Sequence, residues 1–344
     1  MKHNKMDSIS DLINEYQDYF DEESKNALQI LFPSMRRRYN ILLDERKYNW
    51  DKPYWSITRL KLYDCIEISS FTNLVELVCC DSDLTMLPPN IPSSLKKLNC
   101  SCNELTELPM LPDSLETLEC SINELEMLYN LPAGLKKLEC CRNRLSTLPT
   151  LPKTLEILQC SDNNLDMLPE LMIGLKELDC SSNKLAKLPS LPSWLKKLYC
   201  CYNQLEMLPE LPIYLESLFC SNNELTTLNK LPTWLKRLDC SSNELSKLPN
   251  LPSSLNELNC CRNELTELPN LPKTLNVLFC YNNNLTTLPL LPFYLKYLNC
   301  YNNNLTTLPL LPKTLEELNC NNNNLTSLPK LPKTLKKINC SYNL

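Results

Sequence analysis

The chain has 344 residues, a formal net charge of −5, and 20 Cys, 26 Pro, 2 Gly and a single His. An acidic balance argues against a nucleic-acid partner, because binding to phosphate backbones needs a basic surface. No apolar run reaches the roughly 18 residues of a membrane-spanning helix, and the polar start MKHNKMDS does not fit a secretory signal. We therefore expect no membrane association.

The first 56 residues lack the repeat that follows and are predicted to be helical. Apolar residues recur at helical spacing between Ile9 and Phe20, and two further helices are predicted at about residues 22–31 and 34–44. We interpret residues 1–56 as a cap over the exposed end of the first strand, because repeat arrays need capped ends. An F-box-like bundle that recruits a ubiquitin ligase is the alternative, although the usual Leu-Pro opening is missing.

Residues 57–94 contain two irregular repeats. The first begins at Ile57 with ITRLKLYDC, and the second begins at Leu74, only 17 residues later. One extra residue near Asn90 makes the second repeat 21 residues long. Each repeat is expected to supply one short strand.

Residues 95–344 follow the template L-x-x-L-x-C-x-x-N-x-L-x-x-L-P-x-L-P-x-x. Copies begin every 20 residues from Leu95 to Leu335, and the Cys and Asn columns are unbroken. A fixed period of this length indicates a solenoid, in which each unit is too small to bury its own apolar face. The alternation around Leu98 and Cys100 predicts a strand with both side chains inward. About 15 such strands should stack into one parallel sheet.

The Asn column and the Pro-rich limb predict how each repeat leaves and re-enters the sheet. A buried Asn at the end of the strand can pair with backbone groups that the bend leaves free. Leu105, Leu108 and Leu111 are expected to complete the core. Pro109 and Pro112 exclude a helix from the return limb, so we expect an extended, polyproline-like convex side.

The segment LPMLPDSLETLECSINELEML resembles the leucine-rich repeat family, in the 20-residue class of secreted bacterial effectors of the Yersinia outer protein M and invasion plasmid antigen H type. Similar arrays are encoded by giant DNA viruses of amoebae. The resemblance covers roughly residues 57–344 and implies a right-handed solenoid of the α/β horseshoe class with a helical N-terminal cap. It also implies binding to another macromolecule, but repeats of this type serve many partners.

Most of the cysteines belong to the inward column, which argues against a disulfide framework. Neighbouring strands would hold these thiols roughly 4.8 Å apart with parallel side chains, whereas disulfides need converging side chains about 3.8 Å apart at Cβ. We interpret the column as reduced thiols that pack as small hydrophobic groups, which is typical of a cytoplasmic, reducing environment. Metal binding and some disulfide formation are the alternatives.

The chain ends at Leu344, inside the last strand-and-bend unit. An uncovered edge strand would expose backbone groups and the apolar side chains of the core. We expect either that this turn frays or that a second copy of the chain covers it by self-association.

Aromatic side chains on the outward face of the sheet are the candidate partner-binding residues. They form an earlier group and a later group along the chain: Tyr199, Tyr202 and Phe219, followed by Phe279, Tyr281, Tyr297 and Tyr301. Exposed aromatic residues on a rigid sheet are typical interface anchors, although mutually stacked pairs could simply stabilise the ladder. A second line, Trp194, Tyr214 and Trp234, with Tyr294 later, is interpreted as packing over the rim of the core.

The sequence offers no catalytic, cofactor-binding or metal-ligating constellation. The single His is His3, and two glycines cannot build a phosphate-binding loop. Acidic pairs such as Glu116 and Glu119 are expected on a flat surface rather than in a desolvated cleft. We therefore predict a non-catalytic scaffold that binds a protein on the concave sheet face, in the cytoplasm of the cell that makes it or of a host. The alternatives are a ubiquitin-ligase substrate adaptor using residues 1–56 and a structural, particle-associated protein.

Overall fold

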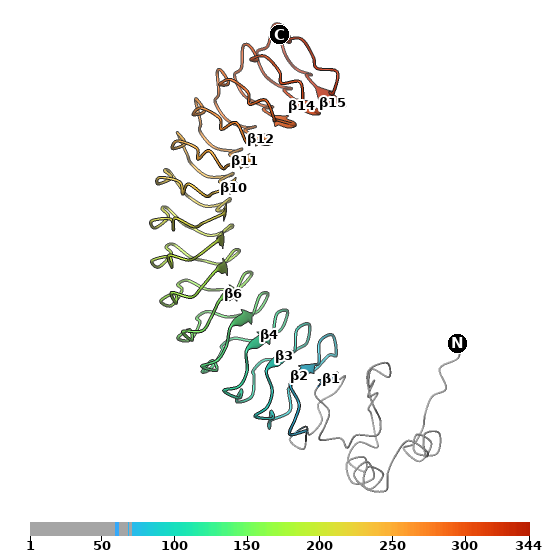
Figure 1. Cartoon of the computed structure of the whole chain (residues 1–344), viewed down its shortest axis with the longest axis vertical. Helices are drawn as coiled ribbons and strands as arrows, with labels where there is room; N and C mark the ends of the chain where they lie inside the picture. Colours follow the sequence, from blue (N-terminus) through green and yellow to red (C-terminus); the bar gives the residue numbers. More distant parts are fainter. Residues whose placement is uncertain (1–58, 62–67, 69–70) are drawn as a thin grey trace, which may run out of the picture. The chain divides into compact units, whose positions relative to one another are not determined.

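The computed structural model describes residues 59–61, 68 and 71–344 (Figure 1). These residues belong to two compact units, the first ending at Leu145 and the second running from Ser146 to Leu344. The helices predicted within residues 1–56 lie outside the described part of the chain. Within the described ranges, the chain has no helix of the length and apolar character that crossing a membrane requires.

Five parallel strands form the sheet of the first unit: β1 (Arg59–Lys61), β2 (Glu76–Val78), β3 (Lys97–Asn99), β4 (Thr117–Glu119) and β5 (Lys137–Glu139). Arg59 lies opposite Glu76, and Glu76 lies opposite Lys97. These offsets reproduce the predicted lengths of the two irregular repeats. The irregular repeats therefore keep the register of the array despite their unusual lengths.

Ten parallel strands follow in the second unit: β6 (Ile157–Gln159), β7 (Glu177–Asp179), β8 (Lys197–Tyr199), β9 (Ser217–Phe219), β10 (Arg237–Asp239), β11 (Glu257–Asn259), β12 (Val277–Phe279), β13 (Tyr297–Asn299), β14 (Glu317–Asn319) and β15 (Lys337–Asn339). Each strand pairs with the next in sequence, and every residue faces the residue twenty positions later. The expected number of short strands and their parallel order are confirmed.

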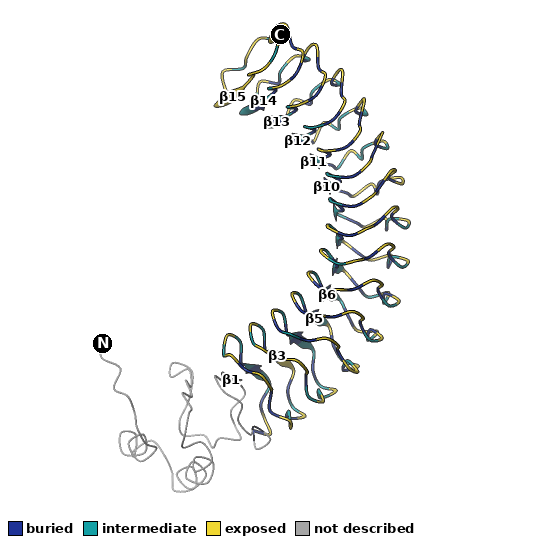
Figure 2. Ribbon diagram, turned by 180° about the vertical axis from the view of Figure 1, so that it is seen from behind, coloured by how far each residue is buried: buried dark blue, intermediate teal, exposed yellow. Residues whose placement is uncertain are grey.

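The core consists of the same columns in each repeat (Figure 2). In the repeat that contains β9, the side chains of Leu215, Leu218, Cys220 and Leu225 are all fully buried. The prediction for the column of Leu111 is only partly right, because that leucine and most of its counterparts are half-buried. They lie on the return limb between prolines, where the chain cannot follow the core closely.

The Asn column closes the bend after every regular strand, as predicted. Asn203 donates from Nδ2 to the carbonyl oxygens of Cys180, Cys200 and Cys201 at 3.0, 3.3 and 3.2 Å. Its Oδ1 accepts from the Leu185 backbone N at 3.0 Å. Since Cys180 and Leu185 belong to the preceding repeat, each Asn side chain also joins two neighbouring repeats.

The residue before each Asn adopts the left-handed backbone conformation, and none of these residues is glycine. In the regular repeats φ is positive throughout, as at Ile122 (φ 57°), Tyr202 (φ 54°) and Asn302 (φ 52°). Asn and Asp accept this region more readily than other residues, and a β-branched side chain is disfavoured there. The bend therefore requires a positive φ in every repeat. Some repeats have Asn or Asp at this position, which adopt it readily, and others have residues such as Ile122, for which it is strained.

The return limb contains no helix within the described residues, which agrees with the effect expected of its prolines. It ends in a tight turn in which the N–H of the first Leu of the next repeat donates to a proline carbonyl, as from Leu215 to Pro212 at 3.1 Å. The turn brings the chain back into the strand direction after each circuit.

Inward thiols such as Cys100, Cys120 and Cys200 form no disulfide and are fully buried, whereas Cys340 in the last repeat is exposed. Burial is the main cause that raises the pKa of each of these thiols well above its ordinary value. Some thiols also donate weak hydrogen bonds along the sheet, as Cys180 Sγ does to the Tyr199 carbonyl at 3.5 Å. These features fit the interpretation of the column as packed, protonated thiols.

Strand β15 is the one strand of the second unit whose three residues are all exposed. Ile338 occupies the inward column and is nevertheless 41% exposed, whereas Leu318 on the neighbouring strand is 2% exposed.

Candidate functional site

The first and third residues of each strand point outward from the sheet, and the residue two positions after the strand continues the same face. In β8 these positions hold Lys197, Tyr199 and Cys201, while Leu198 between them is buried. In-register pairing places the same position of successive repeats side by side. The outward face of the second unit therefore consists of three columns of side chains that cross the strands.

Tyr199 and Phe219 form a stacked pair on this face. Their strands are neighbours and the register places the two residues directly opposite each other. The ring centroids lie 5.0 Å apart with an interplanar angle of 16°. The grouping of these two residues in the sequence prediction is thus realised as a direct contact.

Tyr281 and Tyr301 form a second stacked pair, just beyond β12 and β13. Their ring centroids lie 4.6 Å apart at an interplanar angle of 10°. A hydrogen bond between the Tyr281 hydroxyl and the Cys261 thiol, together with partial burial, raises the pKa of Tyr281 to about 12. The phenol therefore stays protonated at neutral pH and can both donate and accept hydrogen bonds.

The other three predicted residues do not join these pairs. Phe279 lies opposite Asn299, and Tyr297 lies opposite Val277, so the two aromatic residues occupy different columns. Tyr202 sits on the left-handed bend with 61% of its side chain exposed, and it stacks on no ring in the described part of the chain. The seven predicted residues therefore form two stacked pairs and three separate outward side chains.

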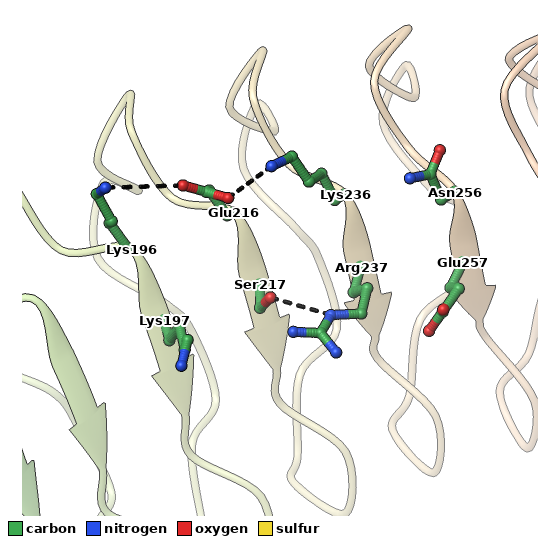
Figure 3. Close-up of a pocket in the computed structure, with 8 residues that line it drawn as sticks. All are labelled: Lys196, Lys197, Glu216, Ser217, Lys236, Arg237, Asn256 and Glu257. Carbon is green, nitrogen blue, oxygen red and sulfur yellow. Dashed lines mark hydrogen bonds and ion pairs between the residues drawn. The ribbon is translucent and has the colours of Figure 1, made fainter.

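A shallow hollow that was not predicted from the sequence shares strands β8 and β9 with the Tyr199–Phe219 pair. Figure 3 shows the residues that line it. Its lining comes from β8 to β11 and from the residue before each of these strands: Lys196, Lys197, Glu216, Ser217, Lys236, Arg237, Asn256 and Glu257. The signal that could have found it is a column of charges at 20-residue spacing, which is easily overlooked when each repeat is examined separately.

Charged groups in the hollow are arranged around Glu216. Its carboxylate accepts from Lys236 Nζ at 2.7 Å and lies 3.9 Å from Lys196 Nζ (Figure 3). The hydrogen bond from Lys236 is the first cause that lowers the pKa of Glu216. Beneath this row, Arg237 Nε donates to Ser217 Oγ at 3.2 Å, and the guanidinium carbon lies 5.9 Å from the centre of the Phe219 ring. Arg237 thus lines the hollow and also lies close to the Phe219 ring of the aromatic pair.

The second aromatic line lies outside this face. Trp194 and Tyr214 stack with their ring centroids 4.9 Å apart and nearly parallel, at 2°. More than half of the Trp194 and Trp234 side chains is exposed, and Tyr294 meets Phe293 edge-on at 5.2 Å. The interpretation of these residues as packing over the rim of the core is therefore incomplete, because Trp194 and Tyr214 stack on each other while remaining 54% and 42% exposed.

Acidic, thiol and imidazole side chains do not gather into a metal-binding arrangement within residues 59–61, 68 and 71–344. Glu116, considered as part of an acidic pair, instead lies between Lys136 at 2.7 Å and Lys96 at 3.4 Å. The hydrogen bond from Lys136 is the main cause that lowers its pKa. Glu116 is therefore held in its ionised form by lysines.

Comparisons with known proteins find relatives that align with nearly the whole chain. The family described as Leucine Rich Repeat matches residues 174–198. YopM from Yersinia enterocolitica is 34% identical, with a TM-score of 0.72 over 96% of this chain and 82% of that chain. YopM from Yersinia pestis, described as a leucine-rich effector protein, is 30% identical, with a TM-score of 0.75 over 97% of this chain and 99% of that chain.

A leucine-rich repeat protein of Leptospira interrogans is 25% identical, with a TM-score of 0.57 over 80% of this chain and 87% of that chain. The search of curated proteins returned no match. The resemblance to giant-virus arrays stays a prediction, because none of these relatives bears on it. The identity and coverage shared with YopM, together with the 20-residue register of the strands, show that this chain belongs to the leucine-rich repeat family.

Proposed function

We propose that this chain is a non-catalytic scaffold that binds a protein partner on the outward face of its sheet. The observation that carries the proposal is the stacked pair of Tyr199 and Phe219 on adjacent strands of a rigid sheet. Aromatic side chains that are already held in one arrangement lose little conformational entropy on binding and are frequent interface hot spots. Similarity to YopM, which is described as an effector protein, supports a role in recognition.

The proposal extends to the organisation and setting of the chain. Residues 57–344 act as the repeat array, and residues 1–56 act as its helical N-terminal cap. The buried free thiols and the similarity to a bacterial effector support a reducing cytoplasm as the place of action, including that of a host cell. Self-association through β15, in which Ile338 is 41% exposed, is a further proposed contact.

A comparison of three forms of the full chain tests the protein-binding face. The wild type, a Phe219→Ala/Tyr297→Ala double variant and a Phe293→Ala variant are immobilised and incubated with host-cell lysate, and the retained proteins are quantified by mass spectrometry. Phe293 is the matched control, because it is 60% exposed but lies on the turn before β13 rather than on the sheet face. We expect a partner retained by the wild type and the control to fall about tenfold or more with the double variant. An identical set of proteins on all three forms would refute the proposal.

A further inference from the structure

Two rows of charge in the second unit share one arrangement. Lys196, Glu216 and Lys236 form the first row, in which the carboxylate lies 3.9 and 2.7 Å from the two ammonium groups. The second row consists of Lys296, Glu316 and Lys336, with distances of 3.8 and 2.6 Å. The two rows therefore form a matched pair within the same unit.

The two rows differ in the side chains that occupy the neighbouring column. Beside the second row, Lys337 is paired with Glu317 at 2.8 Å. Beside the first row the position of that acid is taken by Ser217, which accepts a single hydrogen bond from Arg237 Nε. No carboxylate in the described part of the chain lies within ion-pair distance of Arg237, not even Glu257, its neighbour in register. Arg237 is thus a cation without a charged partner.

Two other acidic groups nearby, Glu177 and Asp239, have partners of their own. Glu177 accepts from Lys197 Nζ at 2.9 Å. Asp239, on the same strand as Arg237, accepts from Ser241 Oγ at 2.6 Å and from Asn259 Nδ2 at 3.1 Å. The lining of the hollow itself has four basic and two acidic residues, which gives an excess of two positive charges on a chain whose net charge is −5. A guanidinium with unused N–H donors can bind a carboxylate through two parallel hydrogen bonds.

We propose that this hollow receives a short acidic segment of the protein partner, with an Asp or Glu carboxylate on Arg237 and a neighbouring side chain against the Tyr199–Phe219 pair. The inference rests on the proposed function and specifies the chemistry of the partner. The hollow spans four strands, roughly 14 Å at the usual spacing, which corresponds to about four residues of extended chain. A nucleic acid would need a longer basic track than these four strands supply.

The test measures binding of a defined peptide to the full chain. A fluorescein-labelled octapeptide of alternating Glu and Tyr is titrated by fluorescence anisotropy at low ionic strength, where charge pairs are least screened. The same peptide with Gln in place of Glu and a single-stranded DNA 12-mer serve as comparison probes. We expect the Glu peptide to bind at least about tenfold more tightly than either comparison probe.

Variants then locate the binding site. Arg237→Gln should weaken binding of the Glu peptide about tenfold, whereas Lys337→Gln at the matched position should change it less than about twofold. Ser217→Glu should abolish binding, because it restores the acid found at Glu317 and pairs Arg237 internally. Ser217→Ala should retain binding. Circular dichroism and thermal unfolding identify the folded variants to be compared.

Several results would overturn the proposal. They are absence of binding by the folded wild type, equal binding of the Gln peptide, tighter binding of DNA, or equal weakening by Lys337→Gln and Arg237→Gln. Any of these, combined with loss of a cellular partner in the Phe219→Ala/Tyr297→Ala variant, would reject the acidic segment while leaving the protein-binding face in place.

Discussion

The buried columns and the outward columns of the sheet share the same strands but differ in how far their side chains vary. In β13, Leu298 is buried, and its counterparts in the second unit are leucine until Ile338. Its neighbour Tyr297 is replaced by valine in the preceding strand and by glutamate in the next. Every repeat must fill the same interior space, whereas the outward side chains have no common packing requirement. Buried residues that stabilise the sheet thus alternate along each strand with outward residues that are free to vary.

The largest contrast is expected in the chemistry of two cysteines two residues apart. Cys100 is fully buried with its pKa raised, and Cys102 is exposed on the bend. Native protein treated with iodoacetamide at pH 8 should be alkylated at Cys102 at least about a hundredfold faster than at Cys100, because Cys100 reacts only after local opening. Tandem mass spectrometry of the peptide distinguishes the sites.

Equal labelling of both thiols would show that the interior is open.

The raised pKa values of the buried thiols also predict how stability depends on pH. Because the folded state favours the protonated thiols, their contribution to stability is fully present below the unfolded thiol pKa and is lost as pH rises through the higher folded values.

The two faces of one strand should differ in their effect on stability. Leu298→Ala removes a buried side chain and should lower the free energy of unfolding by about 3 kcal/mol. Tyr297→Ala on the outward side of β13 should lower it by less than about 1 kcal/mol. Urea denaturation followed by circular dichroism measures both changes. Similar losses for the two variants would contradict the division between interior and face.

The same contrast applies to neighbouring asparagines. Asn303 donates to the carbonyls of Cys280 and Cys300, both at 3.1 Å, and accepts from the Leu285 N–H. Asn303→Ala should lower the free energy of unfolding by about 2 kcal/mol, because it leaves buried backbone groups without partners. Asn304→Ala, one residue later and exposed, should change it by less than about 0.5 kcal/mol in the same urea experiment. An equal effect would show that the Asn column is dispensable.

The smallest effect concerns the bend that connects the two kinds of column. Ile122 holds a β-branched side chain at φ 57°, so Ile122→Asn should raise the free energy of unfolding by about 1 kcal/mol. The reverse change, Asn302→Ile at φ 52°, should lower it by at least as much, since Asn302 also donates to Asn282 Oδ1 at 2.8 Å. Thermal unfolding of the two variants beside the wild type checks the opposite signs.

Much of the fold could be predicted because the same pattern of buried and turn-forming residues recurs in every repeat. The strands, their parallel register and the irregular spacings between Arg59, Glu76 and Lys97 all follow from counting residues between equivalent leucines. The left-handed bend was missed, because residues as different as Ile122, Tyr202 and Asn302 adopt it and no glycine marks it. There the neighbouring hydrogen bonds override local preference.

The candidate site was less predictable, because it depends on which column each side chain occupies. Tyr199 and Phe219 stack because they are equivalent positions one repeat apart. Phe279 and Tyr297 were grouped because they lie on neighbouring strands, but they occupy different columns. The unpaired state of Arg237 emerges only when Ser217 is compared with Glu317, a hundred residues further along.

The asparagine that ties each bend to the preceding repeat also limits how such an array can evolve. In the regular repeats its partners recur at one fixed interval, as Cys180 and Leu185 do for Asn203. Duplication or loss of a complete twenty-residue unit preserves every one of these partnerships, and the identical segments 281–290 and 301–310 are what such a duplication leaves behind. A gain or loss of one residue within the bend would disturb the bonds between the two repeats that it joins, whereas an extra residue in the return limb is tolerated, since Asn103 still bonds Cys79 and Leu84 across the 21-residue repeat. The array can therefore lengthen or shorten in whole repeats, and its outward sheet face gains or loses one strand at a time.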